Sequence, residues 1–253
     1  MYDATYDQLI AQHYDGTYEQ LRDPSGDAGF YARLAGQTGG PVLELGCGTG
    51  RVLLPIARTG VRCVGLDASP AMLDVLRAKE LPANLELVEG TLETFEVPGR
   101  FALIFSAFRV FQHLATVEQQ LACLERVKRH LSPGGCFAFD VFDPDLARMA
   151  VVSEPERHDA TFSDAGDEVR RYASVERDRP SQVMAVTFRY ERRRGGQVVD
   201  EASTTVSMRW FHRYELEHLL ARAGFAVETM HGDFAGAPVG TGGNLVVVAR
   251  AAD

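Results

Sequence analysis

The chain has 253 residues, of which 45% are hydrophobic and 24% charged. This composition can bury one sizeable core, so we predict a single domain over residues 1–253. A formal net charge of -9 supplies no basic field for nucleic acid or an anionic membrane surface, and neither is an expected partner. Residues 1–20 lack a signal-peptide core, and no later run is apolar enough to span a bilayer, which predicts a cytoplasmic location.

Cysteines and histidines are scattered along the chain. The cysteines are Cys47, Cys63, Cys123 and Cys136. Because none forms a C-x-x-C pair, they indicate reduced, mostly buried thiols, with neither a disulfide framework nor a zinc site. The seven histidines are dispersed, and no acidic cluster follows the fourth predicted strand. We therefore expect no metal ion.

Strands and helices are predicted to alternate up to residue 141. Ser69-Pro70 is a helix start with an N-cap hydroxyl before proline, and Thr116 to Gln119 has the spacing of a capping box. The alternation is typical of a parallel, doubly wound sheet. Apolar runs predict strands at 42–45, 61–66, 85–88, 101–105 and 136–141, and amphipathic stretches predict helices at 27–35, 51–59, after Ser69 and between Thr116 and Ser132.

A different pattern begins near residue 150. Met184, Val186, Phe188 and Tyr190 alternate with polar residues, and turn signals at 180–181 and 195–196 divide residues 167–210 into about three antiparallel strands. We predict an inserted antiparallel sheet over residues 150–210, which forms either the roof of a substrate pocket or the contact of a homodimer. A helix at 214–223 and strands at 226–230 and 245–249 complete a seven-stranded α/β sheet.

A Gly-rich turn follows the first strand. Gly46, Gly48 and Gly50 are spaced G-x-G-x-G, and Arg51 occupies the sixth position, where a dinucleotide fingerprint has its third glycine. This spacing argues against a nicotinamide dinucleotide. Backbone N–H groups of such a loop, at the start of a helix, suit a carboxylate such as that of a methionine moiety.

The run from Glu44 to Gly50, Glu-Leu-Gly-Cys-Gly-Thr-Gly, resembles the first motif of class I S-adenosylmethionine-dependent methyltransferases. The resemblance extends to Asp67 with residues 68–73, to Leu131-Ser-Pro-Gly-Gly135 and to Ala223-Gly-Phe225. It implies a Rossmann-like fold, S-adenosyl-L-methionine as cofactor and S-adenosyl-L-homocysteine as product. It also implies cofactor contacts at Glu44, Gly46, Cys47, Gly48, Gly50, Asp67, Ala68, Met72, Thr91, Leu92 and Ser106.

Within this resemblance, Asp67 holds both ribose hydroxyls, Glu44 and the loop hold the methionine end, and Met72 lies against adenine. One position departs from the family. Where the family has Gly-Asp after the third strand, this chain has Gly90-Thr91. Either the Thr91 hydroxyl accepts one neutral hydrogen bond from adenine, or Thr91 caps a turn and the backbone near Leu92 holds adenine.

The loop after the fourth strand, Ser106 to Leu114, should face the transferred methyl group, because ligands lie beyond the carboxyl ends of parallel strands. It lacks the Asn-Pro-Pro-Tyr motif of methyltransferases that act on DNA or protein amides. His113 is the candidate catalytic base, or else a structural residue at the start of the next helix. The segment 101–114 also resembles amino-sugar N,N-dimethyltransferases. Arg109 is either a solvated charge or an anion contact.

Tyrosines recur at Tyr2, Tyr6, Tyr14 and Tyr18, a spacing that puts them along one helix face. Related methyltransferases have an N-terminal lid, and residues 1–26 are predicted to form one here, with Tyr14 in the ligand pocket. The resulting hypothesis is methylation of an oxygen or nitrogen of a small molecule. The alternatives are a cofactor-binding protein without turnover and an NAD-dependent oxidoreductase.

Overall fold

The computed structural model describes residues 10–17, 26–240 and 243–252. The chain forms two compact units, which we call the α/β unit and the β unit. The α/β unit consists of Pro24–Pro144 and Trp210–Asp253, and the β unit of Met1–Asp23 and Asp145–Arg209. Within the described residues, no helix combines the length and apolar character needed to cross a membrane.

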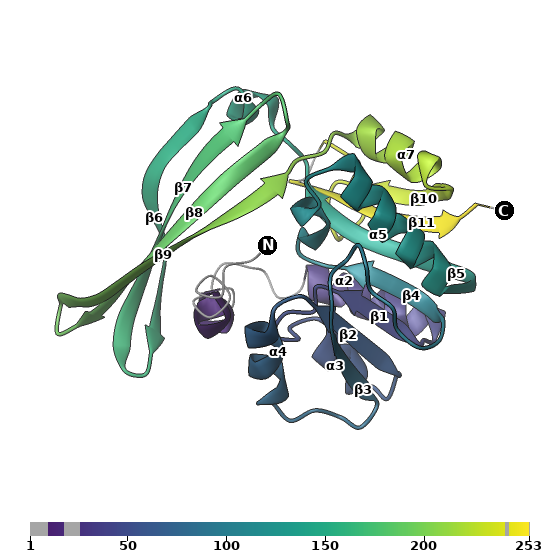
Figure 1. Ribbon diagram of the computed structural model, residues 1–253, viewed down its shortest axis with the longest axis horizontal. Helices are drawn as coiled ribbons and strands as arrows, with labels where there is room; N and C mark the ends of the chain where they lie inside the picture. The colour runs from purple at the N-terminus through teal and green to yellow at the C-terminus, as the bar shows by residue number, and fades with distance from the viewer. Residues whose placement is uncertain (1–9, 18–25, 241–242, 253) are drawn as a thin grey trace. The chain divides into compact units, whose positions relative to one another are not determined.

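The α/β unit contains a seven-stranded sheet with the order β10-β11-β5-β4-β1-β2-β3 (Figure 1). Neighbouring strands from β3 to β5 pair in parallel, whereas β11 is antiparallel to both β5 and β10. The strands are β1 (Val42–Leu45), β2 (Cys63–Asp67), β3 (Leu85–Glu89), β4 (Phe101–Ser106), β5 (Leu131–Phe142), β10 (Phe225–His231) and β11 (Asn244–Ala251). The order reverses between β1 and β4, which is where doubly wound sheets bind ligands.

Helices cover both faces of this sheet (Figure 1). They are α2 (Asp27–Thr38), α3 (Leu53–Ala57), α4 (Pro70–Arg77), the 3-10 helix η1 (Val110–His113), α5 (Val117–His130) and α7 (Arg213–Arg222). Helices α5 and α7 bury their apolar residues on one face, and α2, α3 and α4 do so on the other. Successive side chains of each strand point to opposite faces of the sheet, so a central strand is apolar on both faces.

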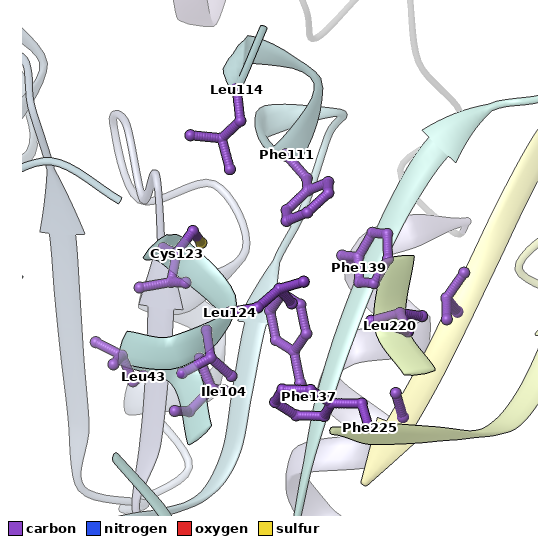
Figure 2. Close-up of a cluster of buried hydrophobic side chains, with 14 of the residues drawn as sticks. Leu43, Ile104, Phe111, Leu114, Cys123, Leu124, Phe137, Phe139, Leu220 and Phe225 are labelled. Carbon is purple, nitrogen blue, oxygen red and sulfur yellow. The ribbon is translucent and has the colours of Figure 1, made fainter. Parts of the chain in front are cut away.

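One of these cores contains a group of aromatic rings (Figure 2). Phe111, from the loop after β4, lies 4.8 Å from Phe139 of β5 between ring centroids. Phe137 lies 5.1 Å from Phe139 in a stacked arrangement. The packing of Phe111 fixes the start of η1 on the sheet, and so anchors the loop that follows β4.

The predicted helix starts are confirmed. The Ser69 hydroxyl accepts a hydrogen bond from the Met72 N–H at 3.1 Å, and Pro70 occupies the first position of α4. Thr116 and Gln119 form a reciprocal capping box at the start of α5. Each cap satisfies N–H groups that have no partner within the helix, so these two boundaries follow from local sequence.

The largest differences from the sequence-based boundaries are at α3 and β5. Helix α3 spans only Leu53–Ala57, shorter than the predicted 51–59. Strand β5 begins at Leu131, directly after α5, so Ser132 to Gly135 lie within the strand as an irregularity of its pairing with β4. A Cβ at Gly135 would stand 2.9 Å from the Phe101 carbonyl oxygen, so the close approach of the two strands there requires glycine.

The β unit contains a four-stranded antiparallel sheet with the order β6-β7-β8-β9. The strands are β6 (Ser153–Asp164), β7 (Asp167–Asp178), β8 (Val183–Arg194) and β9 (Gln197–Arg209), preceded by α6 (Leu146–Met149). The three predicted strands are present, and β6 was missed. It contains Pro155 and many charged residues without apolar alternation, as an edge strand can.

Residues 10–17 form a helix that packs on this sheet. The buried His13 ring stacks on Tyr190 of β8 with centroids 5.2 Å apart and lies 5.6 Å from Phe162 of β6. Burial lowers the pKa of His13, which favours the neutral imidazole. The apolar side of β8 is thus partly covered from within the same unit.

Candidate cofactor and acceptor site

The glycine loop after β1 adopts backbone conformations that only glycine takes readily. Gly46, Gly48 and Gly50 have φ angles of 75°, 51° and 83°. A Cβ at Gly46 would lie 2.5 Å from Val110 Cγ1, and one at Gly50 would lie 2.4 Å from Leu76 Cδ1. Space beside Gly48 is open. The loop therefore packs tightly against its neighbours at Gly46 and Gly50 and leaves open space beside Gly48.

Asp67 ends β2 beside this loop. Its Oδ2 accepts a hydrogen bond from the Gly48 N–H at 2.7 Å, and its Oδ1 accepts from the Ser69 N–H at 2.9 Å. A carboxylate offers about four lone-pair positions, so both oxygens can accept further hydrogen bonds. Asp67 thus holds the glycine loop and has the chemistry needed to bind a pair of hydroxyl groups.

Glu44 is buried in β1, with 2% of its surface exposed. Burial raises the pKa of its carboxyl group well above the ordinary value, and Asp67 and Asp27 raise it further. The Arg51 charge and the Leu53 N–H, which donates to the carboxyl group, only partly offset this effect. Among the described residues, Glu44 Oε2 has no hydrogen-bond partner, and neither has the buried Ser106 hydroxyl. A buried acceptor without a partner is costly, so a ligand cation next to Glu44 would satisfy it.

Arg51 occupies the position where a dinucleotide loop has its third glycine. Its guanidinium forms two hydrogen bonds with the Asp27 carboxylate at the start of α2, one of them 2.9 Å long. The guanidinium also lies over the Phe108 ring, 5.5 Å from the centroid. A side chain that ties the loop to α2 thus replaces the close helix–strand packing that a third glycine permits.

The residues predicted to hold adenine follow β2 and β3. The Gly90 N–H donates to the Asp67 carbonyl at 3.0 Å, which joins the ends of these strands. The exposed Thr91 hydroxyl pairs with that of Thr94 at 2.8 Å, as in a turn. Leu92 is half-buried against the core. Ala68, which follows Asp67 in the chain, and Met72 in α4 are also half-buried. The turn geometry supports the capping interpretation of Thr91, and its contact with adenine stays a prediction.

The loop after β4 has an unusual backbone. Phe108 and Arg109 have φ angles of 62° and 66°, a region that costs about 1–3 kcal/mol for residues with bulky side chains. The Arg109 guanidinium lies 5.5 Å from the centroid of the Phe142 ring, so it is not simply a solvated charge. His113, the candidate base, is half-buried at the end of η1.

Sequence reasoning missed the buried groups that hold this loop. Asp140, fully buried in β5, accepts hydrogen bonds from the Phe108 N–H at 2.8 Å and from the Tyr31 hydroxyl at 2.9 Å. Gln112, also fully buried, accepts one from the Phe142 N–H at 3.1 Å. The signal was present in the sequence, because Asp140 is an acidic residue inside an apolar strand, where a carboxylate needs partners.

Two other groups of predicted residues lie elsewhere. Tyr14 is half-buried on the helix of residues 10–17, in the β unit, whereas the glycine loop belongs to the α/β unit. Its contact with a ligand stays a prediction. Tyr2, Tyr6 and Tyr18 lie outside the described residues.

Within residues 10–17, 26–240 and 243–252, no group of three His, Cys, Asp or Glu side chains is placed to hold a metal ion.

The geometry brings together a glycine loop after β1, the buried Glu44 of β1 and the Asp67 carboxylate at the end of the neighbouring strand β2. This arrangement is typical of nucleotide- and nucleoside-binding proteins of Rossmann-like fold.

Comparison with known proteins narrows the class. Residues 42–135 match a family model described as a methyltransferase domain. Cypemycin N-terminal methyltransferase from a Streptomyces species is 28% identical over 245 residues, which cover 93% of this chain and 92% of that protein. The CcbJ methyltransferase structure from Streptomyces caelestis aligns over 100% of both chains with a TM-score of 0.80 and 25% identity.

A third relative, dTDP-3-amino-3,4,6-trideoxy-alpha-D-glucopyranose N,N-dimethyltransferase from Streptomyces venezuelae, is 26% identical over 92% of this chain and 94% of its own. Together, the methyltransferase-domain match and these relatives support a class I S-adenosylmethionine-dependent methyltransferase. The predicted fold class, with its seven-stranded sheet and inserted antiparallel sheet, is confirmed.

Proposed function

We propose that this chain methylates an amino nitrogen of a small molecule. The observation that carries the proposal is the extent of the similarity. Relatives that match 92–94% of the chain, a length that includes the four-stranded sheet, are named as an N-terminal methyltransferase and two amino-sugar N,N-dimethyltransferases. By contrast, 2-heptyl-1-hydroxyquinolin-4(1H)-one methyltransferase matches only 48% of the chain. Nitrogen is therefore favoured over oxygen as the acceptor atom.

The residues around the glycine loop fit S-adenosyl-L-methionine. The space beside Gly48, whose N–H donates to Asp67, is open to a ligand carboxylate. The Glu44 carboxyl has an oxygen without a partner among the described residues, and the Asp67 carboxylate can accept from two hydroxyls. We assign the carboxylate of the methionine moiety to the position at Gly48, its ammonium group to Glu44 and the ribose to Asp67. The bound cofactor supplies an electrophilic methyl group on a sulfonium.

The chain's own task is to present a neutral amine in line with that methyl group and to remove the proton that the amine loses. We assign proton removal to His113, because it ends the loop beyond the carboxyl end of β4. The competing role for His113 is structural, at the approach to α5. Tyr14 is proposed as a ligand contact, and the inserted sheet is proposed either as an acceptor contact or as a homodimer contact.

The experiment is a labelled-methyl transfer assay over a panel of acceptors in matched pairs. Each pair has one scaffold bearing an amine in one member and a hydroxyl in the other, and the set includes amino sugars and a short peptide with a free N-terminus. Transfer to amines with at least tenfold preference over the matched hydroxyls supports the proposal. Transfer confined to hydroxyls, or to an internal side chain of a protein, contradicts it.

A further inference from the structure

Helix α2 is linked to the loop after β4 (residues 106–114), which we call the acceptor loop, through a buried pair of side chains. The Tyr31 hydroxyl donates to Asp140 Oδ1 at 2.9 Å, and both residues have 0% of their surface exposed. The Tyr31 ring stacks on Phe105 of β4 with centroids 4.7 Å apart, which fixes the direction of its hydroxyl. Burial and the neighbouring Asp140 raise the pKa of Tyr31 well above 10, so the phenol stays a donor.

The same oxygen of Asp140 also accepts from the Phe108 N–H, at 2.8 Å. Phe108 and Arg109 are consecutive residues in the left-handed region, with φ angles of 62° and 66°. Two bulky residues in this region persist only where the surroundings determine their conformation. Asp140 meets that requirement, because its position in the long strand β5 fixes the acceptor of the Phe108 N–H.

The same helix also contacts the glycine loop after β1. Asp27 lies one turn before Tyr31 on α2, so the two side chains share a face of the helix. Asp27 pairs with Arg51, and the Arg51 guanidinium lies over the Phe108 ring at 5.5 Å. Phe108 is thus held at its amide by Asp140 and at its ring by Arg51, and both partners are in turn held by α2.

The geometry points to Tyr31 and Asp140 as positioning residues, which set the backbone of the acceptor loop and thereby the placement of His113 relative to the cofactor site. Neither residue touches the reacting atoms in this role. The inference rests on the proposed function only in assigning the loop Ser106 to Leu114 to the acceptor. It predicts that weakening the pair loosens the loop without removing the cofactor site.

The test compares Tyr31→Phe with Tyr214→Phe. The first change keeps the stack on Phe105 and removes only the hydroxyl, and the second removes a hydroxyl from a tyrosine that is 65% exposed on α7. Asp140→Asn, which keeps an accepting oxygen, and Asp140→Ala, which removes it, form a second pair. Hydrogen–deuterium exchange of the peptide containing Phe108 is measured in the full-length protein, together with calorimetric binding of S-adenosylhomocysteine.

We expect exchange at Phe108 to be at least tenfold faster in Tyr31→Phe and unchanged in Tyr214→Phe, because local opening exposes this amide. Asp140→Asn should lie between wild type and Asp140→Ala. Affinity for S-adenosylhomocysteine should stay within about threefold, whereas kcat with an accepted amine should fall by up to about a hundredfold. If Asp140→Ala does not fold, Tyr31→Phe decides the question.

Phe108 exchange at the wild-type rate in Tyr31→Phe would overturn the inference. So would faster exchange spread evenly over the chain, or a loss of S-adenosylhomocysteine binding equal to the loss of kcat, since either indicates a merely structural role. Because the exchange measurement needs no acceptor, this result is independent of the amine assay. A chain that methylates hydroxyls instead would contradict the proposed function and leave the positioning role standing.

Discussion

The Asp67 carboxylate accepts the Gly48 N–H at 2.7 Å, so the residue expected to hold the cofactor's ribose also orders the glycine loop. Replacing Asp67 with Ala should therefore lower the affinity for S-adenosylhomocysteine by at least a hundredfold, because two charge-assisted hydrogen bonds are each worth about 1.5–3 kcal/mol. Calorimetric titration measures this loss. NADH is the control ligand, and tight binding of NADH by the wild-type protein would contradict the cofactor assignment.

Glycine at position 50 is expected to be required by packing as well as by backbone conformation. Gly50 and Gly60 both have positive φ angles, 83° and 93°, but only at Gly50 would a Cβ clash, 2.4 Å from the buried Leu76. Alanine at either position pays about 1–2 kcal/mol for the left-handed region. Gly50→Ala should cost about 1–3 kcal/mol more in the free energy of unfolding. Urea denaturation of the two variants measures the difference, and equal losses would refute the packing argument.

Burial of Glu44 should make the protein less stable as pH rises. The folded state raises the pKa of this carboxyl, so its favourable contribution is full below the ordinary value of 4.5 and is lost as pH rises through the folded-state pKa. Glu44→Gln removes the cost of ionising a buried carboxyl group. It should raise the free energy of unfolding at pH 8 and have little effect near pH 4.

The same Glu44→Gln variant should bind S-adenosylhomocysteine at least tenfold more weakly, since the amide cannot pair with an ammonium charge. Denaturation curves at the two pH values and one titration test both effects. A variant that is less stable than wild type at pH 8 would show that the carboxyl is satisfied in the protein without a ligand.

His113→Ala should reduce turnover with an accepted amine by about 10²- to 10⁴-fold if His113 removes the proton. His218→Ala, at an exposed position on α7, is the matched control and should leave turnover unchanged. Both variants should bind S-adenosylhomocysteine as wild type does. Unchanged turnover in His113→Ala would assign this residue a structural role at the approach to α5.

The docking of the helix at residues 10–17 should weaken in mild acid. Burial lowers the pKa of His13; Asp164 and Asp200 partly counter this effect, and Arg192 reinforces it. The stabilisation is therefore present above the ordinary pKa of 6.5 and is lost as pH falls. Hydrogen exchange of this helix, corrected for its intrinsic pH dependence, should be several-fold faster at pH 5.5 than at pH 7.5. His13→Phe should abolish the difference, and an equal response in this variant would exclude His13 as its cause.

Local sequence was sufficient for much of the α/β unit. The caps at Ser69 and Thr116, the strand at residues 42–45 and the glycine spacing each depend on neighbours within a few residues, and the structure has all of them. The edge strand β6 was missed, because a strand that pairs on one side needs no apolar alternation to be stable. The start of β5 was misplaced because its pairing with β4 extends beyond the apolar run.

The sequence by itself determined the class of fold and the cofactor loop, since apolar periodicity and glycine positions act over short distances along the chain. Tertiary structure alone decided how that loop joins the rest of the site. The pairing of Arg51 with Asp27, and of Asp140 with Tyr31 and Phe108, joins residues that lie 24 to 109 positions apart. No periodicity marks such pairs, because a buried charge requires a partner but does not specify where along the chain the partner lies.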